Sequence, residues 1–275
     1  MSLNLDTRQR ALLQEMRVQV WMPLARPGVG ASDGAPMARA AVPVAALHAA
    51  APRHMAGAEA PMLKAEDGRL GPRTPVDSMD WPTLADAVAN CSACALCAGR
   101  KMAVFRPEPD IRQADWLVVG EPPDEEEERA GAPFAGRAGQ LLDNMLRALQ
   151  LTRDGAGGAG ARLTNVVKCR PAAVRNPQPR ELAACAIYLR REIALTRPKV
   201  ILAMGRFAAL SLLADGNPEL AMLPFGKLRG QVHRYLGLPV VVTYHPARLL
   251  RAQEDKAGAW ADLCLALAMA HEPRP

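Results

Sequence analysis

The chain has few aromatic residues and no long apolar segment. Aromatic side chains make up 4% of its 275 residues, so its hydrophobic core must consist mainly of Ala, Leu and Val. No apolar stretch approaches the ~20 residues that a membrane-spanning helix needs. The polar segment 1–10 also lacks the apolar core of a secretion signal. We therefore expect a cytoplasmic protein that does not associate with membranes.

Cysteine is scarce as well, with six residues in the whole chain. In the cytoplasm such residues are poor candidates for a disulfide framework. Cys91, Cys94 and Cys97 follow one another at two-residue gaps, which lets neighbouring sulfur atoms converge on one metal centre. Cys169 and Cys185 lie downstream and strengthen the case for a metal site. The spacing alone fits an iron–sulfur cluster, a zinc site or a redox dithiol.

Large apolar side chains are rare in the first 80 residues. Thirteen of the thirty residues from 31 to 60 are Ala, and Gly and Pro lie between them. Such a composition cannot offset the entropy lost when a chain becomes ordered. We predict an N-terminal extension over residues 1–80, with a short helix over 4–21 and a disordered Ala/Pro-rich linker over 22–78. The extension either binds a repair or replication partner or is tolerated low complexity.

Residues 81–275 have the composition of a folded domain. Strands are predicted by four short apolar runs, at 116–120, 163–167, 200–204 and 240–244. Helical patterns alternate with them, at 137–150, 179–196, 205–214 and 254–271. This alternation predicts an α/β fold, a three-layer α/β/α arrangement around a central four-stranded parallel sheet. In such sheets the ligand site lies beyond the carboxyl ends of the strands.

Polar and aromatic side chains follow the predicted strands at that edge. Glu121 comes directly after the first strand, Asn165 belongs to the segment around the second, and His245 follows the fourth. Phe134 lies between Pro and Gly, where it could form a stacking platform for a planar ring. Each also has an ordinary structural interpretation: a solvated acidic face, a turn-forming Asn, a packed His. Together they predict one pocket.

Basic residues gather in the same half of the chain. Between residues 168 and 206 there are nine Lys or Arg against two acidic residues, and between 226 and 251 there are five against none. The formal net charge is +6. A local excess of this size attracts phosphates through counterion release, although solubility alone can also explain helix-borne arginines.

Five motifs, in order along residues 88–270, resemble the family 4 uracil-DNA glycosylases, the iron–sulfur branch of the uracil-DNA glycosylase superfamily. The matching segments are Cys91-x-x-Cys94 with Leu96 and Arg100, Val119-Gly-Glu121-x-Pro123, Gly131-x-Pro133-Phe134-x-Gly136-x-Ala138-Gly139-Gln-Leu141-Leu142, Thr164-Asn165-x-x-Lys168-Cys169-Arg170-Pro171, and Tyr244-His245-Pro246-Ala-x-Leu249-Leu250-Arg251. The domain 81–275 is thus identified as glycosylase-like, and residues 1–80 have no counterpart in the resemblance.

The resemblance implies hydrolysis of the N-glycosidic bond of deoxyuridine in DNA, which releases uracil during base-excision repair. The nucleotide has to leave the base stack first. Glu121 would then position or activate the attacking water, and His245 would donate to the charge that develops on the leaving base. Phe134 would stack on the uracil. Asn165 would bind the polar edge of uracil and reject cytosine, while Glu127 would crowd the C5 edge and exclude thymine.

The resemblance also implies a cofactor and a DNA-binding surface. A [4Fe–4S] cluster would be held by Cys91, Cys94, Cys169 and Cys185, which leaves Cys97 and Cys264 free. The DNA-binding residues would be Arg248, Leu249, Leu250 and Arg251, in a loop that enters the minor groove and fills the gap left by the flipped base. We expect a monomer of bacterial type that acts on uracil-containing DNA at the nucleoid.

Two residues depart from the family pattern. Pro122 and Asp124 stand where small residues are usual, and Pro122 has no backbone N–H to offer to a base or a water. A non-catalytic or altered-specificity DNA-binding member of the superfamily is therefore the first alternative. Without the resemblance, the same residues also fit a zinc-containing nucleotide-binding protein.

Overall fold

The computed structural model describes residues 75–106, 114–153, 160–172, 175–214 and 217–272. The predicted helix over 4–21 and the predicted linker up to residue 74 lie outside these ranges. The last four residues of that linker are described, and there the prediction was wrong. They form the 3₁₀ helix η1, Pro75–Ser78, whose Val76 is buried against the core because it is the one large apolar side chain of the segment.

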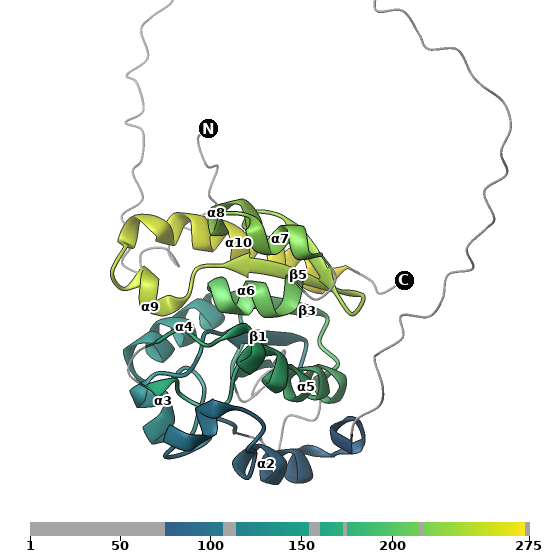
Figure 1. Cartoon of the computed structure of the whole chain (residues 1–275). Coiled ribbons are helices and arrows are strands. Elements are labelled where there is room, and N and C mark those ends of the chain that lie inside the picture. The colour runs from purple at the N-terminus through teal and green to yellow at the C-terminus, as the bar shows by residue number, and fades with distance from the viewer. Residues whose placement is uncertain (1–74, 107–113, 154–159, 173–174, 215–216, 273–275) are drawn as a thin grey trace, which may run out of the picture. The chain divides into compact units, whose positions relative to one another are not determined.

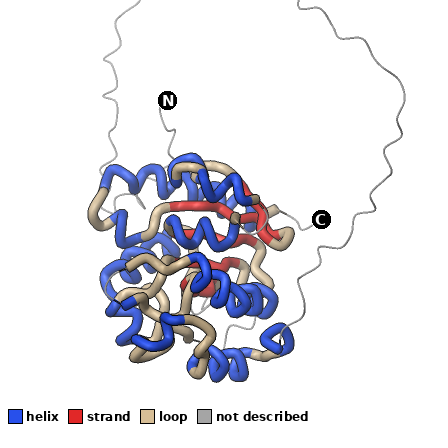
Figure 2. The backbone as a smooth tube through the Cα atoms, in the orientation of Figure 1, coloured by secondary structure: helices blue, strands red, loops and turns tan. Residues whose placement is uncertain are grey.

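A five-stranded sheet forms the centre of the described structure (Figures 1 and 2). Its spatial order is β2-β1-β3-β5-β4. The first four of these strands run parallel, and β4 pairs with β5 in the antiparallel direction. The strand bounds are β1 Trp116–Gly120, β2 Ala161–Asn165, β3 Val200–Met204, β4 Val232–Tyr235 and β5 Leu238–Thr243.

Helices connect the strands and cover both faces of the sheet (Figure 1). The long ones are α2 Trp81–Ala89, α4 Gly136–Ala148, α5 Pro179–Thr196, α6 Arg206–Leu213 and α10 Lys256–His271. The short ones are η2 Ala95–Gly99, α3 Glu125–Ala130, α7 Pro218–Met222, α8 Phe225–Leu228, α9 Pro246–Leu249 and η4 Gln253–Asp255. No helix within the described ranges is both long and apolar enough to cross a bilayer.

Alternating side chains of the strands point into two separate cores. In β1, Leu117 and Val119 pack into the core that also contains residues of α2, α5 and α6. Trp116 and Val118 face the opposite way, into a core shared with α4 and α10. Period-two alternation of this kind is what a strand buried on both faces must show. The predicted three-layer α/β/α arrangement is therefore confirmed.

The sheet differs from the prediction by one strand. The predicted parallel strands all exist, although β2 begins two residues earlier than expected and so does β5. The additional strand, β4, is short and mainly exposed, so it carries no apolar run. It joins β5 through a two-residue turn in which Leu236 and Gly237 both have positive φ angles, 50° and 79°. This geometry is typical of tight hairpins, whose twist matches that of the strands.

The strand order creates a crevice at one end of the sheet. The strand β1 lies between β2 and β3. The chain therefore runs from β1 to β2 on one side, and then crosses to β3 on the other side of β1. Ligands of open α/β sheets bind where the strand order reverses in this way. The segments that follow β1 and β3, and the segment that follows β5, meet at this end of the sheet.

Candidate active site

A cavity of about 710 Å³ lies at the carboxyl ends of the parallel strands. Glu121 reaches it from the end of β1, Arg206 and Phe207 from the start of α6, and His245 from the end of β5. Tyr244 also lines its wall. Glu121 and His245 line the same cavity, as the sequence predicts.

Glu121 has its carboxylate at the N-terminus of α6. Its Oε1 accepts a hydrogen bond from the backbone N–H of Phe207, with 2.7 Å between oxygen and nitrogen. Burial raises the pKa of Glu121 from 4.5 to about 7, although the hydrogen bonds from α6 and the charge of Arg206 act in the opposite direction. Near neutral pH the side chain is therefore divided between its acid and base forms, as a general base at this pH requires.

Gly205 makes this placement of Glu121 possible. It precedes α6 with a φ of +104°, which L side chains rarely adopt. A Cβ atom at this position would overlap the Glu121 carboxylate. Any side chain at residue 205 would therefore displace the carboxylate from the end of α6.

His245 is held as a neutral imidazole with a defined tautomer. Burial and the nearby charge of Arg251 lower its pKa to about 4. Its Nδ1 accepts a hydrogen bond from the backbone N–H of Ala247 at 3.3 Å and so caps α9. In a neutral ring that accepts at Nδ1, the proton resides on Nε2. His245 can therefore donate one hydrogen bond from Nε2 without carrying a charge.

Asn165 and Glu127 form a buried polar pair at the cavity, which Glu127 lines and Asn165 does not. The Asn165 Nδ2 donates to the carbonyl oxygen of Glu121 at 2.8 Å and to the Glu127 Oε1 at 3.2 Å. The Asn165 Oδ1 is buried and has no hydrogen-bond partner in the described structure. An unpaired buried acceptor is costly. A ligand that donates a hydrogen bond to Oδ1 would remove that cost.

Glu127 is occupied by contacts within the protein. Its Oε1 also accepts from the backbone N–H of Phe134 at 2.5 Å, and its Oε2 accepts from that of Asp124 at 2.9 Å. Burial raises the pKa of this carboxyl. Glu127 therefore orients Asn165 and the Phe134 loop, and its side chain is 4% exposed.

Phe134 lies beside the cavity and is closed off from it. Its side chain is 1% exposed, and its ring stacks on His245 with centroids 5.3 Å apart and planes 20° apart. Neither Phe134 nor Asn165 lines the open cavity. The sequence-predicted residues thus fall into two connected groups, with Glu121, Glu127 and His245 lining the cavity and Phe134 and Asn165 directly behind it. Because Phe134 is buried, a base can stack on its ring only after neighbouring side chains move.

The acidic run after β1 is a helix rather than a solvated loop. Asp124 caps α3 by accepting from the Glu127 backbone N–H, and Glu127 caps in return, which is a capping box. Glu128 is also buried and pairs with Arg170 at 2.8 Å. Because two of these carboxylates point inward, the exposed ones are Asp124, Glu125 and Glu126.

Of the predicted DNA-binding residues, Arg248 and Leu249 belong to the short helix α9, Leu250 is its C-cap and Arg251 follows it. Arg248, Leu250 and Arg251 are exposed, and the Arg248 Nε donates to Asp255 at 2.6 Å. Leu249 is wholly buried in the core with α4 and α10. The prediction of a DNA contact for Leu249 is therefore wrong, because one turn of helix places its side chain on the inner face.

Three aromatic cavity residues, Phe207, Phe225 and Tyr244, were not identified as site residues from the sequence. Two guanidinium groups lie over the Tyr244 ring. The guanidinium carbon of Arg229 is 3.8 Å from the ring centroid and that of Arg248 is 4.8 Å from it. Tyr244 precedes His245 in the motif quoted above, which is the signal that could have found it. Phe207 and Phe225 belong to no such motif, so only the fold brings them to this wall.

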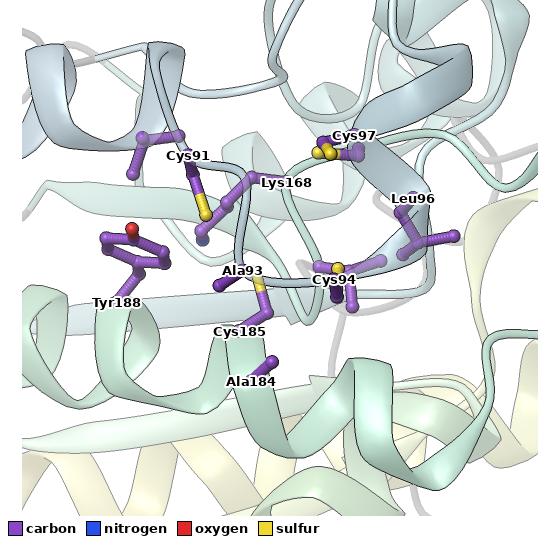
Figure 3. Close-up of a pocket in the computed structure, with 12 residues that line it drawn as sticks. Cys91, Ala93, Cys94, Leu96, Cys97, Lys168, Ala184, Cys185 and Tyr188 are labelled. Atoms are coloured by element: carbon purple, nitrogen blue, oxygen red, sulfur yellow. The ribbon is translucent and has the colours of Figure 1, made fainter.

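Five cysteines line one small, mainly apolar pocket on the α2–α5 side of the sheet. Figure 3 shows Cys91 and Cys94 on the loop that follows α2, with Cys185 and Tyr188 facing them from α5. The remaining two are Cys97 and Cys169. Cys264 lies on α10, away from this pocket. No three Cys, His, Asp or Glu side chains of the described ranges are grouped so as to hold a single metal ion.

Two cations accompany these thiols. The Arg100 Nη1 donates to the Cys169 Sγ at 3.3 Å, and Lys168 lines the pocket. Burial raises the pKa of Cys185 to about 12 and also raises that of Cys169, while Lys168 and Arg100 respectively favour the thiolates. A metal centre would have to displace these protons, and the two cations make that displacement easier.

Lys168 connects the cysteine pocket with the Asn165 site. Its side chain is 2% exposed and forms an ion pair with Glu192. Its Nζ also donates to the carbonyl oxygen of Asn165 at 3.0 Å and to the Thr164 hydroxyl at 2.5 Å. The backbone of Asn165 is therefore fixed by the same residue that borders the thiols.

Comparisons with known proteins agree with this geometry. A family profile described as the uracil DNA glycosylase superfamily matches residues 107–264. The type-4 uracil-DNA glycosylase of Thermotoga maritima is 38% identical over 175 residues, which are 63% of this chain and 84% of that protein. The type-4 enzyme of Pyrobaculum aerophilum is 37% identical over 191 residues, 68% of this chain and 93% of that protein. The one of Saccharolobus solfataricus is 36% identical over 180 residues, 64% and 78% respectively.

Proposed function

The chain belongs to the uracil DNA glycosylase superfamily, and we propose that it hydrolyses the N-glycosidic bond of deoxyuridine in DNA. Uracil is released and an abasic site remains for base-excision repair. The observation that carries the proposal is the pair formed by Glu121 and His245 at one cavity. Burial moves their pKa values to about 7 and about 4, which suits a base and a neutral hydrogen-bond donor.

Glu121 is the group that handles water. The C1′–N1 bond breaks with its electron pair moving to the uracil ring, and water adds to C1′. The ionised Glu121 carboxylate accepts the water proton and stabilises the positive charge that develops on the sugar. The backbone N–H of Phe207 at the start of α6 holds the carboxylate at the cavity through Oε1.

His245 is the group that stabilises the leaving base. The departing uracil carries negative charge on its ring nitrogen N1 and on its carbonyl oxygens. The Nε2–H of a neutral His245 donates to that charge without needing to be protonated first, since its Nδ1 is already committed to Ala247. Because the site is buried, such a hydrogen bond is stronger than in water.

Asn165 and Phe134 are the base-recognition residues of this proposal. The unpaired Asn165 Oδ1 suits the ring N–H of uracil, whereas cytosine carries an acceptor at that ring nitrogen. Phe134 supplies the flat apolar surface for stacking. Glu127 acts by orienting Asn165 and the Phe134 loop. Because Phe134 is buried and its ring contacts that of His245 in the described structure, entry of the base requires neighbouring side chains to move.

The exposed arginines around the cavity bind the phosphate backbone. Arg206 and Arg251 border the cavity and have no salt bridge to any described residue, so their charges are available to phosphates. Arg248 and Leu250 extend this surface along α9. The monomeric state, the nucleoid location and a partner for the N-terminal extension stay predictions.

We assign Cys91, Cys94, Cys169 and Cys185 as the ligands of a [4Fe–4S] cluster. The donor set supports this assignment, because it consists of thiols alone in an apolar pocket with compensating cations. The four thiols would hold the cluster between the loop after α2, the segment after β2 and α5, and the bound cluster would cross-link these three segments.

A non-catalytic member of the superfamily is the second candidate, and Pro122 is the observation behind it. Pro122 lines the cavity and has no N–H to donate. Asp124, in contrast, is engaged in the capping box of α3, so its carboxylate is tied to that helix. The structure thus gives Asp124 a local role and leaves Pro122 as the departure to be tested.

The test is base release from an oligonucleotide with one uracil, beside a matched oligonucleotide with thymine. We expect release from the uracil strand only, and loss of activity in Asn165→Ala and His245→Ala. His271→Ala is the matched control, because His271 is exposed at the end of α10 and does not line the cavity. Tight DNA binding without release from either strand would favour the non-catalytic candidate instead.

A further inference from the structure

Phe134 has a backbone conformation that its side chain does not favour. Its φ angle is +53°, in the left-handed region where bulky residues are uncommon. Such a conformation is strained and persists only where the surroundings enforce it. The residues that enforce it therefore determine where the aromatic ring lies.

The backbone of Phe134 is held from both sides. On the amide side, Glu127 accepts its N–H. On the carbonyl side, the Arg153 Nη2 donates to the Phe134 oxygen at 3.0 Å and to the Gly139 oxygen at 3.0 Å. The Arg153 Nη1 donates to the oxygen of Pro133 at 3.2 Å. One guanidinium group thus connects two carbonyl groups of the loop that carries Phe134 with one in the first turn of α4.

Arg153 is itself oriented by a carboxylate. Its Nε forms an ion pair with Asp143 on α4, and its side chain is 29% exposed. A planar group with several N–H donors in fixed directions suits this task, and an ammonium group cannot reproduce it. Arg153 belongs to none of the sequence motifs quoted above and lies between α4 and β2.

We propose that Arg153, oriented by Asp143, is a positioning residue that fixes Phe134 as the stacking platform for the extruded base. The inference rests on the proposed function and deepens it, because it names a residue that controls affinity for the base without touching it. A stacking surface binds the base in the ground state and in the transition state alike. Loss of its positioning therefore raises KM more than it lowers kcat.

The experiment compares the wild-type protein with Arg153→Met, Arg153→Lys and Arg147→Met. Arg147 is a matched control, since it is exposed on α4 and bonds only to Asn144 in the described structure. For Arg153→Met we expect KM for uracil-containing DNA, and the inhibition constant of free uracil, to rise about tenfold, the scale of one lost charged hydrogen bond. Arg153→Lys keeps the charge beside Asp143. Its KM and its inhibition constant should therefore lie between those of the wild type and those of Arg153→Met.

Binding to DNA with an abasic site separates positioning from general folding. That ligand has no base to stack, so its affinity should be unchanged in Arg153→Met. The effect of Arg153→Met on free-uracil inhibition should also vanish in a Phe134→Leu background.

Equal uracil inhibition constants in wild type and Arg153→Met would overturn the inference. So would a parallel loss of affinity for abasic DNA, or an effect that persists in Phe134→Leu. If the wild-type protein itself releases no uracil, the proposed function fails, and this inference fails with it.

Discussion

At the scale of single residues, burial acts on the two cavity groups in opposite directions. It raises the pKa of Glu121 to about 7 because the charged carboxylate loses hydration. It lowers the pKa of His245 to about 4 for the same reason, since there the protonated form is the charged one. One environment thus produces a base and a neutral donor at the same pH.

The rate of uracil release should therefore depend on pH through Glu121 alone near neutrality. As pH rises through about 7, Glu121 loses its proton and the single-turnover rate increases, then levels off. His245 is already neutral in this range, so its titration does not change the rate. Glu121→Gln should lower the rate by about 100-fold and abolish the dependence. A wild-type rate that is flat from about pH 5 to about pH 9 would contradict this role.

The same shift has a consequence for stability. Because the folded-state pKa of Glu121 is raised from 4.5, the folded protein disfavours the ionised form. Ionisation of Glu121 therefore lowers the free energy of unfolding. This loss grows from pH 4.5 to about pH 7 and stays constant at higher pH. Thermal unfolding of Glu121→Gln, which stays neutral, should show a Tm gain over wild type that is larger above pH 7 than at pH 5. A gain independent of pH would exclude this linkage.

Gly139 should be intolerant of Ala, although it lies in α4. In an exposed helix Gly→Ala usually stabilises by about 1 kcal/mol. Here a Cβ would overlap the carbonyl oxygen of Phe134, and overpacking costs typically about 1–3 kcal/mol. We expect Gly139→Ala to lower stability in denaturant unfolding and to weaken free-uracil inhibition. Gly226→Ala is the control, since nothing lies within 4 Å of a Cβ there.

Residues that follow a buried strand could be identified from the sequence, and those that act through backbone contacts could not. Glu121 and His245 stand out because each directly follows an apolar run. The contacts of Arg153 go to carbonyl groups of another loop, and every residue has a carbonyl group. Its role therefore has no sequence signal and becomes visible only in the folded chain.

At the scale of elements, strands buried on both faces were predicted well. Their apolar runs are continuous because both faces of the sheet are covered. The edge strand β4 was missed because it is mainly exposed, and α3 was missed because its acidic residues looked like a solvated run. In α3 the signal was present, since Asp124 and Glu127 have the spacing of a capping box.

The cysteine pocket joins three elements, so its ligands should matter for folding and for metal content alike. Cys185→Ser should lose iron and the visible absorbance of the cluster, and its Tm should fall. Cys264→Ser should keep both, because Cys264 lies on α10 outside the pocket. Iron and sulfide analysis of anaerobically purified protein measures this directly. Zinc without iron in the wild-type protein would contradict the assignment.

At the scale of the whole molecule, the strand order brings the site together. Glu121, Arg206 and His245 come from the ends of three strands that are neighbours only in the order β1-β3-β5. Strand pairing is non-local, so the sequence predicted the common edge and not the order. Asn165 reaches the same edge from β2, which pairs with β1 on its other side.

The charge around the cavity should appear in the salt dependence of DNA binding. Arg251→Gln removes one exposed cation beside the site and should reduce the slope of log Kd against log salt by about one. The reduction should be equal for DNA with and without uracil, because a phosphate contact carries no base information. Arg147→Gln on α4 is the control. An unchanged slope for Arg251→Gln would remove Arg251 from the DNA interface.

The central claim is that this chain removes uracil from DNA, and mass spectrometry after a single turnover tests it most directly. Folded protein with its iron–sulfur content verified is mixed in excess with an oligonucleotide that contains one uracil, beside its thymine counterpart. We predict free uracil together with a strand that has lost one base, and an intact thymine strand. An intact uracil strand would contradict the account.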